Sequence, residues 1–352
     1  WPEPVYVYAS RRVVAMASMA DGLRPEQAIV ALYNPKQQGL LSVLKTFGLA
    51  PEDFQELALA HGFTDLAAPL HNWQDPRLLA FLADEQVQAG IRPIGQAARA
   101  RLQAYFEQQG FFACERAALV DIGWNGTIQK FLHESFGQRP DYPEVHGWYL
   151  AFVAAMHGDF GMGERIEGLL LDARRGDAYE RAPMDFEEIF EQAARAAEGT
   201  TLGYQAVEGR IVPLLKSDDS PDRHGELACN PLIAQLQAGV LEHLEDFHAV
   251  WSLTGYKAQQ LKPYVQALLE RAVVYPTPEE VAHIGQLVHT EDFGHDHTLD
   301  IAPPPVGWLD LLRPRQLYRR LRPLAWKFAA FAHFPSDLPA WLFRLVHLKK
   351  RQ

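Results

Sequence analysis

Short apolar runs and amphipathic helical repeats alternate in the middle of this 352-residue chain. An apolar run over residues 117–120 ends at Asp121, and an amphipathic helical pattern follows over residues 127–136. Residues 145–153 are predicted to be a second strand and residues 166–171 a weaker third one. Strands that alternate with helices are typical of parallel βαβ packing. The pattern therefore predicts an α/β fold.

The first residues also have a strand pattern. Residues 5–9 are apolar and β-prone, and they lead into Ser10, Arg11 and Arg12 and a helical pattern as far as Ala20. We expect residues 5–9 to be a strand of the same sheet. A strand so near the first residue, without a signal-peptide pattern, predicts the back part of a longer protein; a processed N-terminus is the alternative.

Residues 21–110 have helical spacing and almost no strand character. Four prolines are placed where helices are expected to start: Pro25, Pro51, Pro76 and Pro93. This segment is predicted to be a helical insertion between the strands.

The chain after residue 185 is predicted to be mainly helical. Its expected elements are a helix over 186–197, a hairpin over 204–215 with its turn at Glu208-Gly209, a polar loop over 217–226, helices over 231–252 and 258–273, and a helix capped by Thr277. The predicted architecture is a Rossmann-like parallel-sheet core (1–20 and 111–216), a large helical insertion (21–110), a helical C-terminal subdomain (217–300) and a basic amphipathic tail (301–352).

Composition excludes several classes of protein. Hydrophobic residues make up 48% of the chain and charged residues 22%, which is typical of a globular domain. Two cysteines are too few for a disulfide scaffold or a cysteine-based zinc module. The net charge of −11 argues against a nucleic-acid binder, and no apolar run is long enough to be a transmembrane helix.

The net charge is unevenly distributed. Residues 313–352 contain ten Lys/Arg and one acid, which gives this segment a charge of +9. Because the whole chain has a net charge of −11, residues 1–312 have a net charge of −20. Basic segments with Trp and Phe, here over 308–352, commonly lie at an anionic membrane surface. The alternative is that the aromatic residues pack on the body and the arginines pair with its acidic surface.

The segment from Val120 to Thr127, VDIGWNGT, contains the strongest chemical signal. An apolar strand delivers Asp121 to its carboxyl end, where ligands bind in parallel sheets. The following glycines allow a close backbone approach, Thr127 is a candidate helix cap, and the helix N-terminus favours an anion. We predict Asp121 as the catalytic candidate, able to orient sugar hydroxyls or a Mg²⁺ ion; a purely structural βα turn is the alternative. The candidate phosphate-binding residues are Ser10, Arg11, Arg12, Gly123, Trp124, Asn125, Gly126, Thr127 and Gln129.

Three other groups carry weaker signals. Glu187, Glu188 and Glu191 are interpreted as a solvated helix face, and Cys114 has no predicted activating neighbour. The densest histidine cluster does not have the spacing of one ligand face, so no metal site is predicted there. Its members are His283, His289, Asp292, His295, Asp296 and His297.

The order of YVYASRR, a helical insertion and ALVDIGWNGTIQKFL resembles bacterial predicted hydrolases of the haloacid dehalogenase (HAD) superfamily. Further similar stretches lie at 186–215 and 275–294. The resemblance implies a cytoplasmic accessory region, following an upstream HAD-type domain, in a protein of surface-polysaccharide synthesis. The nucleophile motif D-x-D-x-[TV] of that domain does not occur here, so its chemistry is not transferred.

The DIGWNGT loop also looks like the ribose-phosphate loop of phosphoribosyltransferases, although Ile122 stands where the second acid is expected. We therefore expect this chain to bind a phosphorylated sugar or nucleotide-sugar, with possible sugar or phosphoryl transfer. The rival hypothesis is a non-catalytic module that docks a hydrolase or glycosyltransferase at the inner membrane surface.

Overall fold

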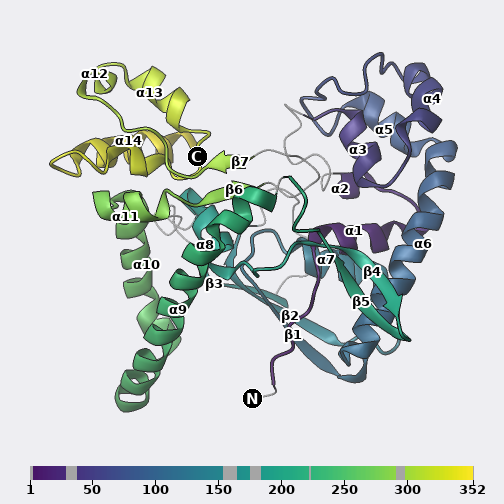
Figure 1. Cartoon of the computed structure of the whole chain (residues 1–352), viewed down its shortest axis with the longest axis horizontal. Helices are drawn as coiled ribbons and strands as arrows, with labels where there is room; N and C mark the ends of the chain where they lie inside the picture. The colour runs from purple at the N-terminus through teal and green to yellow at the C-terminus, as the bar shows by residue number, and fades with distance from the viewer. Residues whose placement is uncertain are drawn as a thin grey trace.

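The computed structural model describes residues 3–28, 38–153, 165–174, 184–221, 223–290 and 298–351. It is a mixed α/β structure that contains a three-stranded parallel sheet (Figure 1). The strands are β1 (Arg116–Asp121), β2 (Glu144–Phe152) and β3 (Ile166–Asp172), with β2 in the middle. The three strands predicted from apolar runs are therefore confirmed, and so is their parallel pairing.

Helices cover one face of this sheet. α1 (Arg11–Ser18) and α7 (Thr127–Phe136) pack together with Leu119 of β1 in one hydrophobic core. The opposite face is open: Val120 is 78% exposed, and Trp148 and Leu169 beside it are also exposed. Parallel sheets are normally covered on both faces, so the open face is unusual.

The expected strand over residues 5–9 is wrong. This segment runs extended toward α1 without pairing with any described strand. Side chains satisfy its backbone: the Tyr105 hydroxyl accepts from the Tyr8 amide at 3.0 Å, and the Tyr204 hydroxyl donates to the Tyr8 carbonyl at 2.7 Å. An apolar run indicates a buried or half-buried extended segment, but it does not say whether a partner strand is available.

The segment after α1 is helical, as predicted. Its helices are α2 (Pro25–Ala28), α3 (Leu40–Thr46), α4 (Gln55–Ala60), α5 (Pro76–Ala83) and α6 (Glu85–Gln108). They enclose a hydrophobic core that includes Phe47, Phe81 and Ile91. Pro93 was expected to start a helix, but it lies inside α6, which is capped nine residues earlier by Asp84. The Asp84 carboxylate accepts from the Gln86 amide, and that cap determines the start of the helix.

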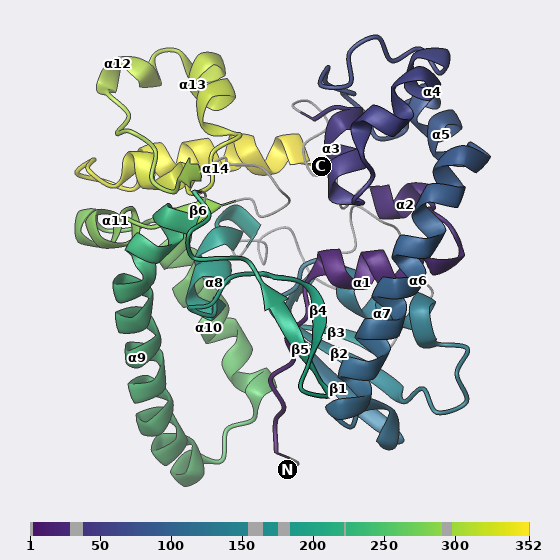
Figure 2. The same ribbon diagram turned by 45° about the vertical axis from the view of Figure 1, so that its right-hand side comes forward.

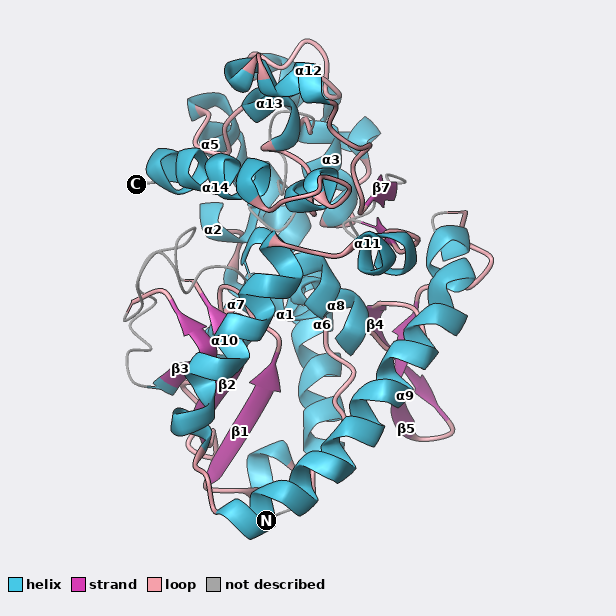
Figure 3. Ribbon diagram, turned by 90° about the vertical axis from the view of Figure 1, so that its left-hand side faces the viewer, coloured by secondary structure: helices cyan, strands magenta, loops and turns pink. Residues whose placement is uncertain are grey.

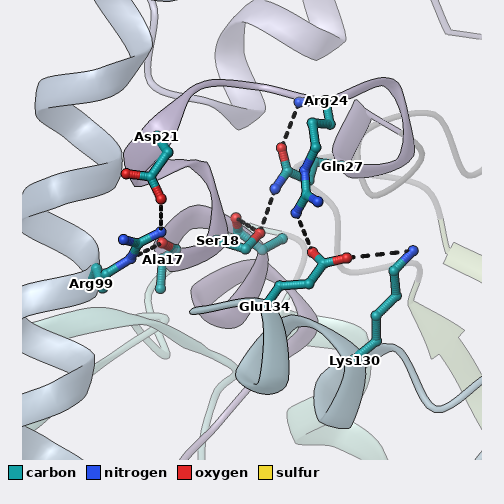
Figure 4. Close-up of polar contacts among 9 residues, drawn as sticks. Ala17, Ser18, Asp21, Arg24, Gln27, Arg99, Lys130 and Glu134 are labelled. Atoms are coloured by element: carbon teal, nitrogen blue, oxygen red, sulfur yellow. Dashed lines mark hydrogen bonds and ion pairs between the residues drawn. The ribbon is translucent and has the colours of Figure 1, made fainter. Parts of the chain in front are cut away.

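A polar network joins α1, α2, α6 and α7 at one end of the sheet (Figure 4). The fully buried Gln27 donates to the Ser18 hydroxyl at 2.7 Å and accepts from the Arg24 amide. Arg24 in turn pairs with Glu134 of α7, and Arg99 of α6 bonds the Ala17 carbonyl at 3.1 Å. These contacts fix the helical insertion on the covered side of the sheet.

The predicted hairpin is confirmed as β4 (Thr201–Val207) and β5 (Arg210–Leu215). Glu208 and Gly209 form its turn, both with positive φ. The hairpin packs on α6, where the Gln108 side chain bonds the Ile211 backbone amide and carbonyl.

The C-terminal half is mainly helical (Figures 1 and 2). Its elements are α8 (Glu187–Ala194), α9 (Arg223–Thr254), α10 (Ala258–Val274), α11 (Pro278–Ile284), β6 (Val288–Thr290), β7 (Thr298–Asp300), α12 (Trp308–Leu311), α13 (Pro314–Leu321) and α14 (Leu338–Arg351). Thr277 caps α11 in a capping box, as predicted. α9 starts at Arg223, so part of the expected loop over 217–226 is helical.

Several aromatic residues of the C-terminal tail lie inside a core of this half. Trp326 is 1% exposed, stacks on Phe186 with ring centroids 4.6 Å apart, and donates to the Val273 carbonyl at 2.9 Å. Phe328, Phe331 and Phe343 are buried in the same core. The tail is therefore part of the hydrophobic core that it helps to form.

Buried polar contacts also fix the tail. The Asp185 carboxylate lies 3.0 Å from Nε2 of His347 and 3.7 Å from Nζ of Lys327, and all three residues are buried. Arg344 of α14 pairs with Glu270 of α10. Because a buried charge is costly unless it is paired, these contacts allow only one position for α14.

Two tryptophans of the tail test this packing. Trp326→Ala is expected to lower the free energy of unfolding by about 3–5 kcal/mol, because it leaves a cavity beside Phe186 and an unpaired Val273 carbonyl. Trp308→Ala is the matched control, because the Trp308 side chain is 66% exposed. It should lower the free energy of unfolding by less than about 1 kcal/mol. Urea unfolding measures both; equal losses would contradict the assignment of Trp326 to the core.

Candidate functional site

The candidate site lies at the carboxyl end of β1. Asp121 is the last residue of this edge strand and lies opposite Tyr149 of β2. The backbone amide of Gly123 donates to its carboxylate at 3.4 Å, and the loop over residues 122–126 leads directly into α7. The structure therefore places Asp121 where the sequence predicted it, at the strand end that ligands occupy in parallel sheets.

Burial dominates the electrostatics of Asp121. It raises the pKa of this carboxyl above its ordinary value of 3.8, and the charge of Glu191 acts in the same direction. Hydrogen bonds from the Gly123 and Ile122 amides and the positive charge of Arg11 oppose the rise. Arg11 thus interacts electrostatically with Asp121.

The glycines of the loop have a structural role. Gly123 has φ +132°, and a Cβ there would lie 2.2 Å from the Ala151 carbonyl oxygen. Gly126 has φ +66° and packs against Ile166 and Phe152. Both glycines are required by close contact with neighbouring strands, so their presence alone does not indicate a ligand.

α8 covers the loop, a contact that the sequence did not predict. The Trp124 indole donates to the Glu191 carboxylate at 3.2 Å and meets Phe190 edge to face, with centroids 6.2 Å apart. Glu187, Glu188 and Glu191 are half-buried and all have polar partners, so their interpretation as a solvated helix face is wrong. Local helical spacing does not reveal which helix face meets a loop more than sixty residues earlier.

Asn125 has an unsatisfied group in this loop. Its Oδ1 atom is buried and has no hydrogen-bond partner in the described part of the chain. A buried amide oxygen without a partner is costly, and a hydroxyl or another donor of a ligand would satisfy it. Asn125 is therefore the residue of the loop whose environment the fold leaves incomplete.

Two predicted ligand-binding residues, Gln129 and Ser10, instead hold the fold together. Gln129 is fully buried and bonds the Val145 carbonyl and the Tyr149 hydroxyl. The Ser10 hydroxyl caps α1 and donates to the Thr201 carbonyl at 2.7 Å, so it does not end a strand. Thr127 is not the helix cap that the sequence predicted: it is the first residue of α7, and Gly126 occupies the N-cap position without a side-chain cap.

Arg11 and Arg12 point to different places. Arg11 interacts with Asp121, whereas Arg12 lines a separate cavity of about 460 Å³ between α1, α6 and β4. The walls of that cavity are mainly apolar, with Arg101 as its second basic residue. Consecutive residues of a helix lie about 100° apart, and in this structure the two arginines meet different surroundings, so they do not form the single ligand-binding pair that the sequence predicted.

Metal binding has no support within the described residues, which contain no cluster of three or more His, Cys, Asp or Glu side chains suited to a metal ion. Asp292, His295, Asp296 and His297 of the histidine cluster lie outside the described residues. Cys114 is exposed, and its thiol lies 3.2 Å from the Phe111 carbonyl.

The structure thus brings together Asp121, Arg11 and Trp124, and it adds Glu191 from α8. Comparisons with protein-family models and with curated proteins give no match for this chain. The arrangement is a half-buried carboxylate beside a guanidinium, at the junction of β1 and α7 and under α8.

The raised pKa of Asp121 predicts a pH-dependent effect of Asp121→Asn. An acid whose pKa is raised by folding contributes stability below its unfolded pKa of 3.8, and this contribution is lost as the pH rises through the folded pKa. Asn cannot ionise, so the variant should need more urea than the wild type to unfold at pH 7, and the same amount near pH 3.5.

Asp75→Asn is the control with the opposite sign. A hydrogen bond from Arg77 lowers the pKa of Asp75, so this substitution should reduce stability at pH 7. Asn is as good a helix cap as Asp, which keeps the start of α5 intact. Urea midpoints between pH 3.5 and pH 8 measure both variants, and a loss of stability for Asp121→Asn at pH 7 would refute the burial argument.

Proposed function

We propose that this chain is the accessory, non-catalytic region of a HAD-type hydrolase-like protein of bacterial surface-polysaccharide synthesis, and that it docks on an anionic membrane surface. The resemblance of its sequence motifs supplies the biological context. The surface of α12, α13 and α14 is the single observation that carries the docking function.

Apolar side chains of this surface face outward. On α14 the exposed positions are Leu338, Trp341, Leu342, Leu345 and Val346, whereas Phe343 and His347 face the core. The helix is therefore apolar on both its inner and its outer side. α12 and the residue that follows it add Trp308, Leu309 and Leu312. Exposed Trp and Leu on a basic amphipathic segment are characteristic of interfacial helices.

Basic side chains lie close to the apolar ones. Arg315, Arg319 and Arg322, on α13 and just after it, are exposed, and none of them forms an ion pair with a described residue. Arg320 is different, because it pairs with Asp310 at 3.2 Å. Unpaired arginines are available to lipid phosphates, and each contributes about 1 kcal/mol near an anionic surface.

This mode of binding requires no membrane-spanning element. Within the described ranges, no helix combines the length and the hydropathy needed to cross a bilayer. The −20 charge of residues 1–312 would repel an anionic surface, so the +9 segment would also orient the protein with its C-terminal helices toward the lipid.

Vesicle sedimentation tests the membrane proposal. Wild-type protein should bind phosphatidylglycerol vesicles and not phosphatidylcholine vesicles, with binding weakened by salt. Changing Arg315, Arg319 and Arg322 to Gln should reduce the affinity about 100-fold, since roughly 3 kcal/mol is lost. Trp341→Glu with Leu345→Glu should abolish binding, because both side chains would enter the interface.

Trp148→Ser is the matched control, since Trp148 is an exposed tryptophan of β2, a strand that lies apart from α14 (Figure 1). Its vesicle binding should equal that of the wild type. Deleting the tail would not be a clean test, because Trp326 and Phe343 belong to the core. Wild-type protein that stays in the supernatant with anionic vesicles would refute the proposal.

A second candidate function is binding of a phosphorylated sugar or nucleotide-sugar at the Asp121–Thr127 loop. Two observations favour it: the unpartnered Asn125 Oδ1 and the half-buried carboxylate of Asp121, whose pKa is raised, beside Arg11. In a Rossmann-like core this strand end is the ligand site. Asp121 and Asn125 would accept hydrogen bonds from sugar hydroxyls, and Arg11 would pair with a phosphate.

Thermal shift with nucleotide-sugars and sugar phosphates, with and without Mg²⁺, tests this second function. A ligand at about 100 times its Kd should stabilise the wild type by about 2.7 kcal/mol, a rise of several degrees in Tm. Arg11→Gln and Asn125→Ala should remove the shift. Arg12→Gln, which changes the neighbouring guanidinium that lines the other cavity, should keep it. An unchanged Tm of the wild type across the panel would eliminate this function.

A further inference from the structure

The far half of the α9–α10 helical pair has almost no packing within the described chain. All residues from 238 to 257 are exposed, and residues 259, 260 and 263–265 of α10 are exposed as well. α6 is a helix of comparable length, yet it buries Val87, Ile91 and Leu102 in two cores. We refer to residues 238–269 as the distal hairpin.

α9 has an apolar stripe in the distal hairpin. Val240, Leu244, Phe247 and Trp251 are exposed and spaced by four, three and four residues, which places them on one side of the helix. Leu241 widens the stripe at its start. A stripe with this spacing normally faces a partner helix, as in coiled coils and bundles.

α10 has a matching stripe. Leu261, Val265 and Leu268 follow the same spacing, and Tyr264 lies beside them. Val265, Leu268 and Tyr264 are exposed. Two neighbouring helices of one chain therefore both present apolar ridges to solvent.

The two helices do not cover each other. They separate beyond the C-terminal core, and Figures 2 and 3 show α9 and α10 splayed apart. On the sheet side, Gln266 of α10 bonds the Leu170 carbonyl of β3 at 2.8 Å, which holds α10 away from α9. Single helices of this length are marginally stable in water without packing, so the distal hairpin requires a partner.

The charges of the two helices are complementary. The part of α9 in the distal hairpin contains Glu242, Glu245 and Asp246 and no Lys or Arg. Residues 255–269 contain Lys257 and Lys262 and no acid. The surface of one helix is thus suited to contact the surface of the other, although the fold keeps them apart within one chain.

We propose that the distal hairpin is the dimerisation element of this protein, and that it packs against the distal hairpin of a second copy. In a two-fold arrangement α9 of each copy meets α10 of the other, and every contact occurs twice. Both apolar stripes are buried in a four-helix bundle, and the acids of α9 lie opposite the lysines of α10. A self-complementary surface of this kind needs no other protein.

Charge reversal in two sets of residues tests the dimer; all of them are exposed except the half-buried Lys262, and none belongs to a hydrophobic core. One variant reverses α9 (Glu242→Lys, Glu245→Lys and Asp246→Lys), and the other reverses α10 (Lys257→Glu and Lys262→Glu). Light scattering after gel filtration should show a dimer for the wild type at tens of micromolar and a monomer for each variant alone. An equimolar mixture of the two variants should again form a dimer, because opposite charges then face each other across both contacts.

Mixing separates the dimer from closure within one chain, since a contact inside a chain cannot be rescued by another molecule. Reversal of Glu52, Asp53 and Glu56, three exposed acids of the helical insertion, is the control and should leave the dimer unchanged. A monomeric wild type would overturn the proposal. So would variants that remain dimeric alone, or a mixture that remains monomeric.

Discussion

The stacking of Trp326 on Phe186 determines how the two halves of this chain are related. Phe186 directly precedes α8, and Trp326 lies 140 residues later in the C-terminal tail. The Trp326 indole also donates a hydrogen bond to the Val273 carbonyl. Together these two contacts fix the start of α8 in the hydrophobic core of the C-terminal half. α8 then extends over the loop after β1, where Glu191 accepts from Trp124. The candidate site is therefore completed by a helix whose position depends on the end of the chain.

A three-stranded sheet with one open face is small for a chain of this length. Separate hydrophobic clusters form around the helical insertion, around α1 and α7, and around Trp326. Each buries its own apolar side chains, and polar contacts such as those of Gln27 and Asp185 join the elements around them. Apolar side chains remain exposed on α12, on α14, on the distal hairpin and on the open face of the sheet, where no described element covers them. Exposed apolar patches of this size commonly mark sites of interaction.

The site shows how one motif can combine two roles. Gly123, Gly126 and Gln129 are explained by packing. A side chain at either glycine would crowd residues of β2 or β3, and the buried Gln129 side chain bonds the backbone of β2. Asp121 and Asn125 are not explained in this way: one is a carboxyl with a raised pKa, and the other has an unsatisfied amide oxygen. Groups that cost stability and have no packing role are often retained for function.

Local patterns in the sequence were sufficient for the elements whose stability is local. The apolar run before Asp121, the helix over 127–136, the turn at Gly209 and the cap at Thr277 all depend on neighbouring residues, and all four were predicted correctly. The parallel pairing of β1, β2 and β3 was also predicted correctly, but two features that depend on more distant or competing contacts were not. Residues 5–9 have a strand pattern but meet tyrosine hydroxyls instead of a strand, and Pro93 is accommodated within α6 because Asp84 provides the cap.

For the function, the sequence by itself determined which chemical groups are available: a carboxylate at a strand end, two arginines and a cationic aromatic tail. Only the tertiary structure decided how they are used. In the folded chain Arg11 and Arg12 lie at different sites, and Glu191 lies against the loop after β1. Some aromatic residues of the tail are buried in the core, and others are exposed at the surface. The physical reason is that the direction of a side chain follows from local helical geometry, whereas the group that it meets depends on which distant segment packs there.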